Sequence, residues 1–135
     1  MDARGRARTL DKIFLVGIGG AVGSILRFLV SGWAQNVSGV SFPFGTLTVN
    51  VLGCFIIGVL SYLADVRGVL TPEMRALLII GVLGGFTTFS SFGNETMALV
   101  RDGEMGYALA NVALSLTLGL GAVYVGRTLG GLVWR

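Results

Sequence analysis

Apolar residues along this 135-residue chain gather into four long runs that are separated by short polar segments. The runs cover about residues 13–33, 45–64, 76–100 and 106–129. Each run holds about 20 residues or more, which is the length that a helix needs to cross a hydrocarbon core of ~30 Å. The pattern therefore predicts an all-α membrane protein with four transmembrane helices.

The polar segments around these runs suggest a simple domain organisation. Residues 1–12 read as a basic N-terminal arm, and residues 13–135 as a single four-span domain. Ahead of the third run, Thr71-Pro72-Glu73-Met74 has the features of a helix start, with a hydroxyl cap, a proline at the first position and then an acid. We expect the third helix to begin there.

Positive charges are distributed unevenly between the two ends of the predicted spans. Four spans place both termini on one side of the membrane, and that side carries eight of the ten basic residues: Arg4, Arg6, Arg8, Lys12, Arg67, Arg75, Arg127 and Arg135. The opposite side has only Arg101 and, if it is counted there, Arg27, which lies inside the first run. By the positive-inside rule, we expect the termini to face the cytoplasm.

Composition excludes several classes of function. Charged residues make up 13% of the chain, against about 25% in soluble domains. The chain has no histidine and a single cysteine, Cys54, and no nucleophile–base pair or metal cluster is apparent. The basic residues lie at segment ends and form no stripe of the kind that binds nucleic acid. We expect neither an enzyme nor a nucleic-acid partner.

The middle of the third run is unusually polar for a membrane span. Gly84 and Gly85 are followed within a few positions by four hydroxyl residues, Thr87, Thr88, Ser90 and Ser91. One interpretation is a helix broken in mid-membrane, whose freed carbonyls bind a cation or whose freed N–H groups bind an anion. The other is a glycine kink whose hydroxyls bond back to the helix.

Two aromatic residues in the same segment have two possible roles. Phe89 and Phe92 lie three positions apart, which places them on one face of a helix. Their rings can pack against neighbouring helices, or they can turn their positive edges toward an anion.

Polar stripes also occur on the second and fourth runs. Thr46, Asn50 and Cys54 recur every four residues on the second run, and the fourth run holds a similar stripe of Tyr107, Asn111 and Ser115. Such residues can act as hydrogen-bonding contacts between helices. Two stripes beside a broken third helix favour a narrow polar pathway.

Charged groups within the spans are few. Arg27 can reach the membrane interface along its own helix, or it can raise the positive potential of a vestibule that gathers anions. Glu95, near the end of the third run, is equally open to a structural or a functional role. The first, second and fourth runs contain no acid, which argues against a proton-coupled exporter.

Together these motifs resemble the CrcB, or Fluc, family of bacterial fluoride channels. Four stretches carry the resemblance: Gly19-Gly20 through Gly23 to Arg27-Phe28, Gly45-Thr46-Leu47 through Asn50 to Gly53, Gly84 to Phe92 with Glu95, and Tyr107 through Asn111 to Ser115. Their order and their positions within the spans make the signal specific.

The resemblance implies a passive, fluoride-selective channel that exports fluoride from the cytoplasm across the bacterial plasma (inner) membrane. It also implies an antiparallel, dual-topology homodimer with two pores, in which the carbonyls of Gly84 and Thr87 from both chains hold a structural sodium ion. The implied fluoride pathway comprises Thr46, Asn50, Thr88, Phe89, Ser91, Phe92, Tyr107, Asn111 and Ser115, with Arg27 and Glu95 in the vestibule.

Two alternatives to a fluoride channel stay open at this point. A small four-span exporter of drugs or cations would share the length and the dimeric habit, and a membrane scaffold without transport would use the polar stripes as contacts alone. A further tension concerns topology, since an antiparallel homodimer requires both insertions whereas the charge count favours one.

Overall fold

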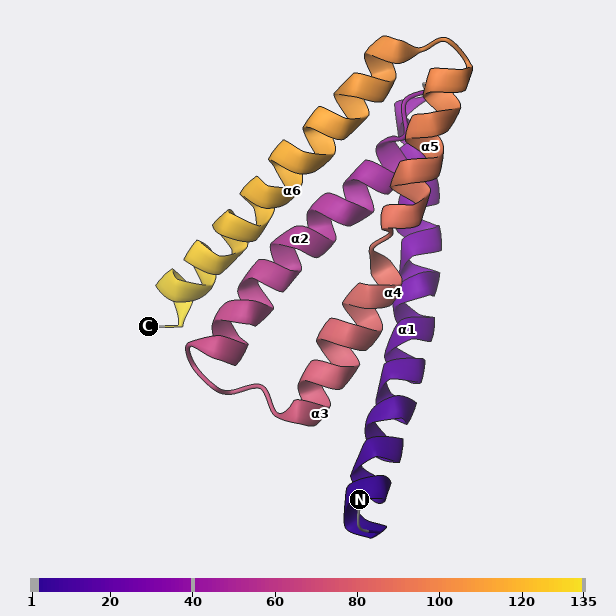
Figure 1. Cartoon of the computed structure of the whole chain (residues 1–135). Coiled ribbons are helices and arrows are strands. Elements are labelled where there is room, and N and C mark those ends of the chain that lie inside the picture. Colours follow the sequence, from indigo (N-terminus) through magenta and orange to yellow (C-terminus); the bar gives the residue numbers. More distant parts are fainter. Residues whose placement is uncertain (1–2, 40, 135) are drawn as a thin grey trace.

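The computed structural model describes residues 3–39 and 41–134, and every regular element in these ranges is a helix (Figure 1). Four stretches are long and apolar enough to cross a membrane: Arg8–Ser38, Phe44–Asp65, Pro72–Arg101 and Met105–Val133. The prediction of an all-helical chain with four membrane-spanning helices is thereby confirmed, with boundaries a few residues wider than expected.

Seven helical elements make up the four spans. The first, second and fourth spans are the continuous helices α1 (Ala3–Ser38), α2 (Phe44–Asp65) and α6 (Met105–Val133). The third span is divided into α3 (Pro72–Met74), η1 (Arg75–Leu83), α4 (Gly84–Phe86) and α5 (Phe89–Arg101). Successive spans run in opposite directions, so α1 begins at the same end of the bundle at which α6 ends (Figure 1).

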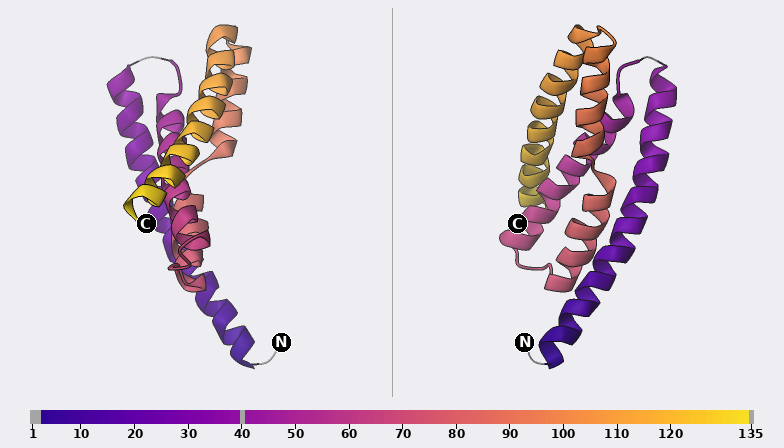
Figure 2. Two further views of the ribbon diagram at one scale, coloured as in Figure 1. Left: turned by 90° about the vertical axis from the view of Figure 1, so that its left-hand side faces the viewer. Right: turned by 45° about the vertical axis from the view of Figure 1, so that its right-hand side comes forward.

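Helix α1 is longer than the apolar run from which it was predicted. Its 36 residues correspond to about 54 Å at 1.5 Å per residue. It begins at Ala3 and continues through most of the basic arm, so no change of backbone marks residue 12. Its first turns project beyond the start of the third span (Figure 2).

The third span begins at the predicted residues. The Thr71 hydroxyl accepts a hydrogen bond of 3.2 Å from the Met74 N–H, and Pro72 and Glu73 occupy the first helical turn. The following segment, η1, is a π-helix over Arg75–Leu83, a rare form. No residue pattern in this segment distinguishes a π-helix from an α-helix, so the sequence alone does not predict it.

Glycines allow pairs of helices to approach closely. A Cβ added at Gly19 of α1 would lie 2.5 Å from the Leu77 carbonyl oxygen of η1. On the opposite side of the bundle, a Cβ at Gly126 of α6 would collide with the Phe55 carbonyl of α2. Small residues at such contacts are typical of membrane helices, whose association depends on close packing because lipid supplies no hydrophobic driving force.

Charged residues close one end of the bundle. The Asp65 carboxylate at the end of α2 lies 3.4 Å from Arg75 of η1 and 3.9 Å from Arg127 of α6. The Arg75 guanidinium also donates a 2.6 Å hydrogen bond to the Ala64 carbonyl. These contacts join the second, third and fourth spans at the end where the chain termini lie.

Candidate ion pathway

The helix of the third span is interrupted at Thr87 and Thr88. Both residues have extended backbone, with ψ angles of 157° and 112°, between α4 and α5. The interruption falls within the hydroxyl-rich segment that the sequence marked as a possible break. Helical hydrogen bonding therefore does not continue from η1 and α4 into α5.

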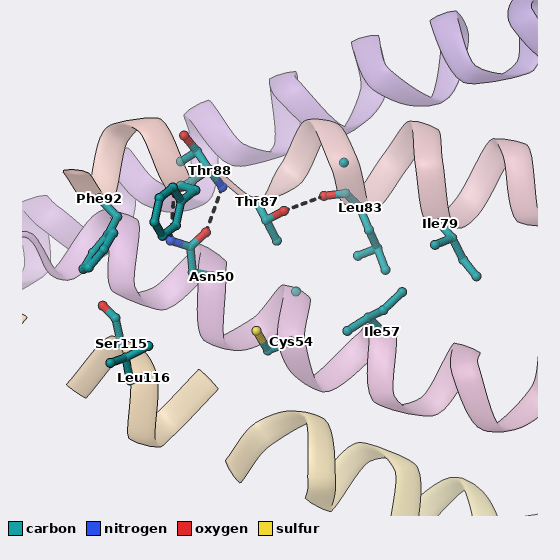
Figure 3. A pocket seen from close by; sticks show the side chains of 13 residues that line it. Asn50, Cys54, Ile57, Ile79, Leu83, Thr87, Thr88, Phe92, Ser115 and Leu116 are labelled. Carbon is teal, nitrogen blue, oxygen red and sulfur yellow. Dashed lines mark hydrogen bonds between the residues drawn. The ribbon is translucent and has the colours of Figure 1, made fainter. Parts of the chain in front are cut away.

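Asn50 of α2 fills the interruption with two hydrogen bonds (Figure 3). Its Oδ1 accepts from the Thr88 N–H at 2.8 Å, and its Nδ2 donates to the Thr88 carbonyl at 3.1 Å. A buried backbone group without a partner is costly, and this amide supplies partners for both groups of Thr88. Asn50, in the middle of the second span, thus stabilises the interrupted backbone of the third span.

The hydroxyls beside the break also bond locally. Thr88 caps α5, since its Oγ1 accepts a 3.2 Å hydrogen bond from the Ser91 N–H and donates to the Ser91 hydroxyl at 3.1 Å. The Thr87 hydroxyl donates to the Leu83 carbonyl at 3.0 Å, which is the back-bonding that the kink interpretation expected. The segment therefore combines the interrupted helix of the first interpretation with the back-bonded hydroxyl of the second.

A groove of about 410 Å³ opens beside the interruption and is bounded by α2, the third span and α6 (Figure 3). Seven residues of the predicted site line it: Asn50, Gly84, Thr87, Thr88, Phe89, Phe92 and Ser115. The Ser115 hydroxyl is buried and has no hydrogen-bond partner among the described residues. A hydroxyl in this state is a donor available to an ion in the groove.

The two phenylalanines lie together at this groove. Their ring centroids are 5.4 Å apart, and the planes are tilted by 44°. Phe89 is 82% exposed in the single chain, whereas Phe92 is partly buried. An aromatic ring this exposed within a membrane span can face lipid, a pathway or a partner.

Two further predicted residues pair with each other away from the groove. The Thr46 hydroxyl of α2 donates a 2.7 Å hydrogen bond to Glu95 Oε1 of α5. The other carboxylate oxygen of Glu95 is buried and lacks a partner in the described part of the chain. The contact joins α5 to α2 one turn and a half beyond Phe89.

The remaining predicted residues do not line the groove. Asn111 is 1% exposed and donates to the Thr96 hydroxyl, Tyr107 packs edge-on against Phe42 at 6.0 Å, and Ser91 bonds with Thr88. Arg27 lies half-buried on α1. Their roles in the pathway stay predictions.

Several groove residues were not predicted. The apolar part of the lining comes from Gly53, Ile57, Ile79, Leu83 and Leu116, whereas Cys54, which also lines the groove, belongs to the predicted stripe of the second run. Gly53 has a clear reason, because a Cβ there would collide with the Thr87 methyl group. Thr96 was also missed, although its place one turn after Phe92 could have indicated a contact with that residue's carbonyl.

Comparison with known proteins identifies the family. A sequence profile described as "CrcB-like protein, Camphor Resistance (CrcB)" matches residues 14–127. The chain belongs to the CrcB family. A protein named "Fluoride-specific ion channel FluC" from Shewanella baltica (strain OS185) is 46% identical over 120 residues, which cover 89% of this chain and 96% of the relative. Relatives of the same name from Shewanella sp. (strain ANA-3) and Shewanella putrefaciens (strain CN-32) are 45% and 44% identical over the same shares.

Gly84 and Thr87, the residues expected to bind sodium in this CrcB chain, offer backbone carbonyl oxygens as ligands. In a continuous helix, the carbonyls of Gly84 and Thr87 would accept from the N–H groups of Thr88 and Ser91, but these donate to the Asn50 and Thr88 side chains. Carbonyl oxygens are good ligands for a hard monovalent cation. No group of three His, Cys, Asp or Glu side chains that could hold a metal occurs among the described residues.

Proposed function

We propose that this chain forms a passive, fluoride-selective channel. The observation that carries the proposal is its 46% identity, over 89% of its length, to a relative named as a fluoride-specific ion channel. The groove supports it, since it brings together an amide, a free hydroxyl and two aromatic rings beside a helix interruption. Neither alternative gains comparable support, because the first, second and fourth apolar runs contain no acid for a proton-coupled exporter and a scaffold needs no groove.

A second copy of the chain, inserted in the opposite direction, completes the pathway. The groove is open in the single chain, and Phe89 at its edge is 82% exposed. A partner packed against this face covers both, and two equivalent grooves then become two pores of opposite direction. The interruption at Thr87 and Thr88 lies near the centre of the membrane in this arrangement.

A sodium ion at the centre of the dimer supports the two interrupted helices. Gly84 is exposed at the surface of the single chain, as a ligand shared between two chains must be. The carbonyls of Gly84 and Thr87, two from each chain, surround the ion. Its task is structural, since it neutralises carbonyl dipoles that a continuous helix would have satisfied.

Fluoride loses its hydration shell in the pore and exchanges it for protein donors. Asn50 has a second amide hydrogen, Ser115 has a buried hydroxyl without a partner, and the edges of Phe89 and Phe92 carry partial positive charge. These donors line one groove, where together they can replace the water around a small, hard anion such as fluoride. The vestibule charge of Arg27 raises the local fluoride concentration.

The electrochemical gradient drives the export. Hydrogen fluoride crosses lipid uncharged and dissociates in the cytoplasm, so fluoride accumulates inside. A potential of −100 mV is worth about 2.3 kcal/mol for one charge, which at equilibrium lowers internal fluoride about 50-fold relative to the outside. A passive channel in the bacterial plasma membrane is therefore sufficient for protection.

The test of this function is ion efflux from liposomes that hold the purified protein, with a potassium ionophore to dissipate charge. We expect rapid release of fluoride and none of chloride. Release that depends on an imposed proton gradient would favour an exporter instead. If the folded protein releases neither anion, the remaining interpretation is a membrane scaffold without transport.

A further inference from the structure

We propose that Asn111 and Thr96 form a positioning pair, which fixes the rotation of α5 and with it the place of Phe92 in the pathway. The proposal rests on the proposed fluoride channel and goes beyond it in assigning a role to Thr96. It also gives Asn111 a role other than direct contact with the ion.

Asn50 holds the start of α5 through Thr88, but the backbone of the preceding helices does not fix how α5 is rotated about its own axis. Its 13 residues follow two extended residues, Thr87 and Thr88, so no helical hydrogen bonds transmit a rotation from η1 into α5. Phe89 and Phe92, in its first two turns, line the groove. A rotation of α5 about its own axis would move both rings.

A chain of two hydrogen bonds joins α6 to the turn that begins at Phe92. Asn111 Nδ2 donates to Thr96 Oγ1 at 2.9 Å, and Thr96 Oγ1 donates to the Phe92 carbonyl at 2.7 Å. The Thr96 hydroxyl has one hydrogen, which the Phe92 carbonyl takes, so the hydroxyl meets Asn111 only as an acceptor. Hydrogen bonds linked in this way polarise and strengthen one another.

A hydrogen bond of Glu95, the residue before Thr96, further restrains the rotation of α5. Glu95 accepts from Thr46 of α2 at 2.7 Å, and Glu95 and Thr96 point about 100° apart on the helix. One tether alone leaves α5 free to swing about it. Two tethers to different helices, at different angles around the axis, define a single rotation.

Burial favours a positioning role for Asn111 over a ligand role. Its side chain is 1% exposed and does not line the groove, whereas Phe92 and Ser115 do. Its amide nitrogen is directed at Thr96. An ion passing through the groove therefore contacts Phe92. Asn111 acts on the ion only indirectly, by fixing the position of Phe92.

The test compares fluoride and chloride efflux of variants in liposomes. Thr96→Val keeps the shape but removes both bonds of the hydroxyl, Asn111→Leu removes the donor, and Thr96→Ser keeps the hydroxyl. The matched control is Thr117→Val, because the Thr117 hydroxyl bonds only to the Ala113 carbonyl of its own helix, at 2.7 Å. Dimer assembly and thermal unfolding are measured for each variant, so that loss of fold is separated from loss of position.

We expect Thr96→Val and Asn111→Leu each to lower fluoride efflux about threefold to tenfold, in line with one interhelical hydrogen bond in a membrane. The fluoride-to-chloride ratio falls in both, and the double variant is no worse than the more impaired single variant, because the two residues act as one unit. Thr96→Ser and Thr117→Val keep wild-type efflux and selectivity.

The following results would overturn the pair. One is wild-type efflux and selectivity in folded Thr96→Val, and another is additive losses in the double variant.

If the apolar variants do not assemble, Asn111→Ser decides, since its hydroxyl is too short to reach Thr96 but can still donate to an ion. Wild-type efflux in Asn111→Ser would exclude the tether, and reduced efflux would support it. No fluoride efflux from the wild-type protein would contradict the proposed function itself, and the pair with it.

Discussion

At Asn50, one side chain supplies both of the hydrogen bonds that the interrupted helix leaves open around Thr88. The same amide lies in the groove and has a second hydrogen to offer an anion. An aspartate of similar size would accept from the Thr88 N–H but could not donate to its carbonyl, and its charge would repel fluoride. Both the break and the pathway therefore depend on an amide at this position.

We expect Asn50→Asp to lower fluoride efflux at least tenfold, because it removes the donor to the Thr88 carbonyl and places a negative charge in the groove. Liposome efflux measures the effect. The matched control is Asn36→Asp, at an exposed position near the end of α1, which should keep wild-type efflux. Equal efflux from both variants would show that Asn50 does not face the ion.

We also expect Phe89→Ile and Phe92→Ile each to lower fluoride efflux about tenfold, because an aliphatic side chain has no positive edge for an anion. Phe28→Ile serves as the control, since Phe28 is 77% exposed on α1 and does not line the groove. Unchanged efflux in both groove variants would remove the phenylalanines from the pathway.

At the level of helices, contacts through glycine determine how closely the spans approach. Gly126 of α6 lies directly against the Phe55 carbonyl of α2, whereas Gly121 of the same helix has nothing within 4 Å of an added Cβ. The two positions thus separate the effect of a contact from that of helix propensity, since alanine is the better helix former at both.

We predict that Gly126→Ala lowers the free energy of unfolding by about 1–3 kcal/mol, because the two backbones must separate to admit the methyl group. Gly121→Ala should leave this free energy unchanged or raise it by up to about 1 kcal/mol. Denaturant unfolding in detergent measures both values. Equal effects would mean that the close α2–α6 contact is absent from the protein in detergent.

The elements differ in how far the sequence could predict them. Spans, helix start and interruption follow from local patterns: apolar runs, Thr71-Pro72-Glu73, and glycines followed by hydroxyls. The pairing of Asn50 with Thr88 could not be predicted, because it depends on how helices far apart in sequence meet. The π-helix of η1 could not be predicted either, because no residue pattern there distinguishes it from an α-helix. Thr96 could not be predicted as a contact of Asn111, because its own neighbours give no sign of that residue.

For the whole molecule, the central structural question is the arrangement of two chains. The eight-to-two distribution of basic residues favours one insertion, whereas the proposed dimer requires both. Four of the eight, Arg4, Arg6, Arg8 and Lys12, belong to the first 12 residues. Without these four the bias is four to two, so it is weaker but still favours one insertion.

Labelling with a membrane-impermeant thiol reagent tests the two insertions. In a Cys54→Ala background, we introduce Glu104→Cys in the exposed turn before α6. Dual topology predicts that about half of the chains react from outside intact cells and the rest only after permeabilisation. Complete labelling from one side would contradict the antiparallel dimer.

The most direct test of a passive, fluoride-selective channel is the reversal potential of its current in a planar bilayer. With a tenfold fluoride gradient and equal chloride on both sides, the account predicts a reversal at about 59 mV, the equilibrium potential of fluoride. The value should not move when a pH gradient is imposed. A reversal near 0 mV would show that fluoride is not selected, and a shift with the pH gradient would show that transport is coupled to protons.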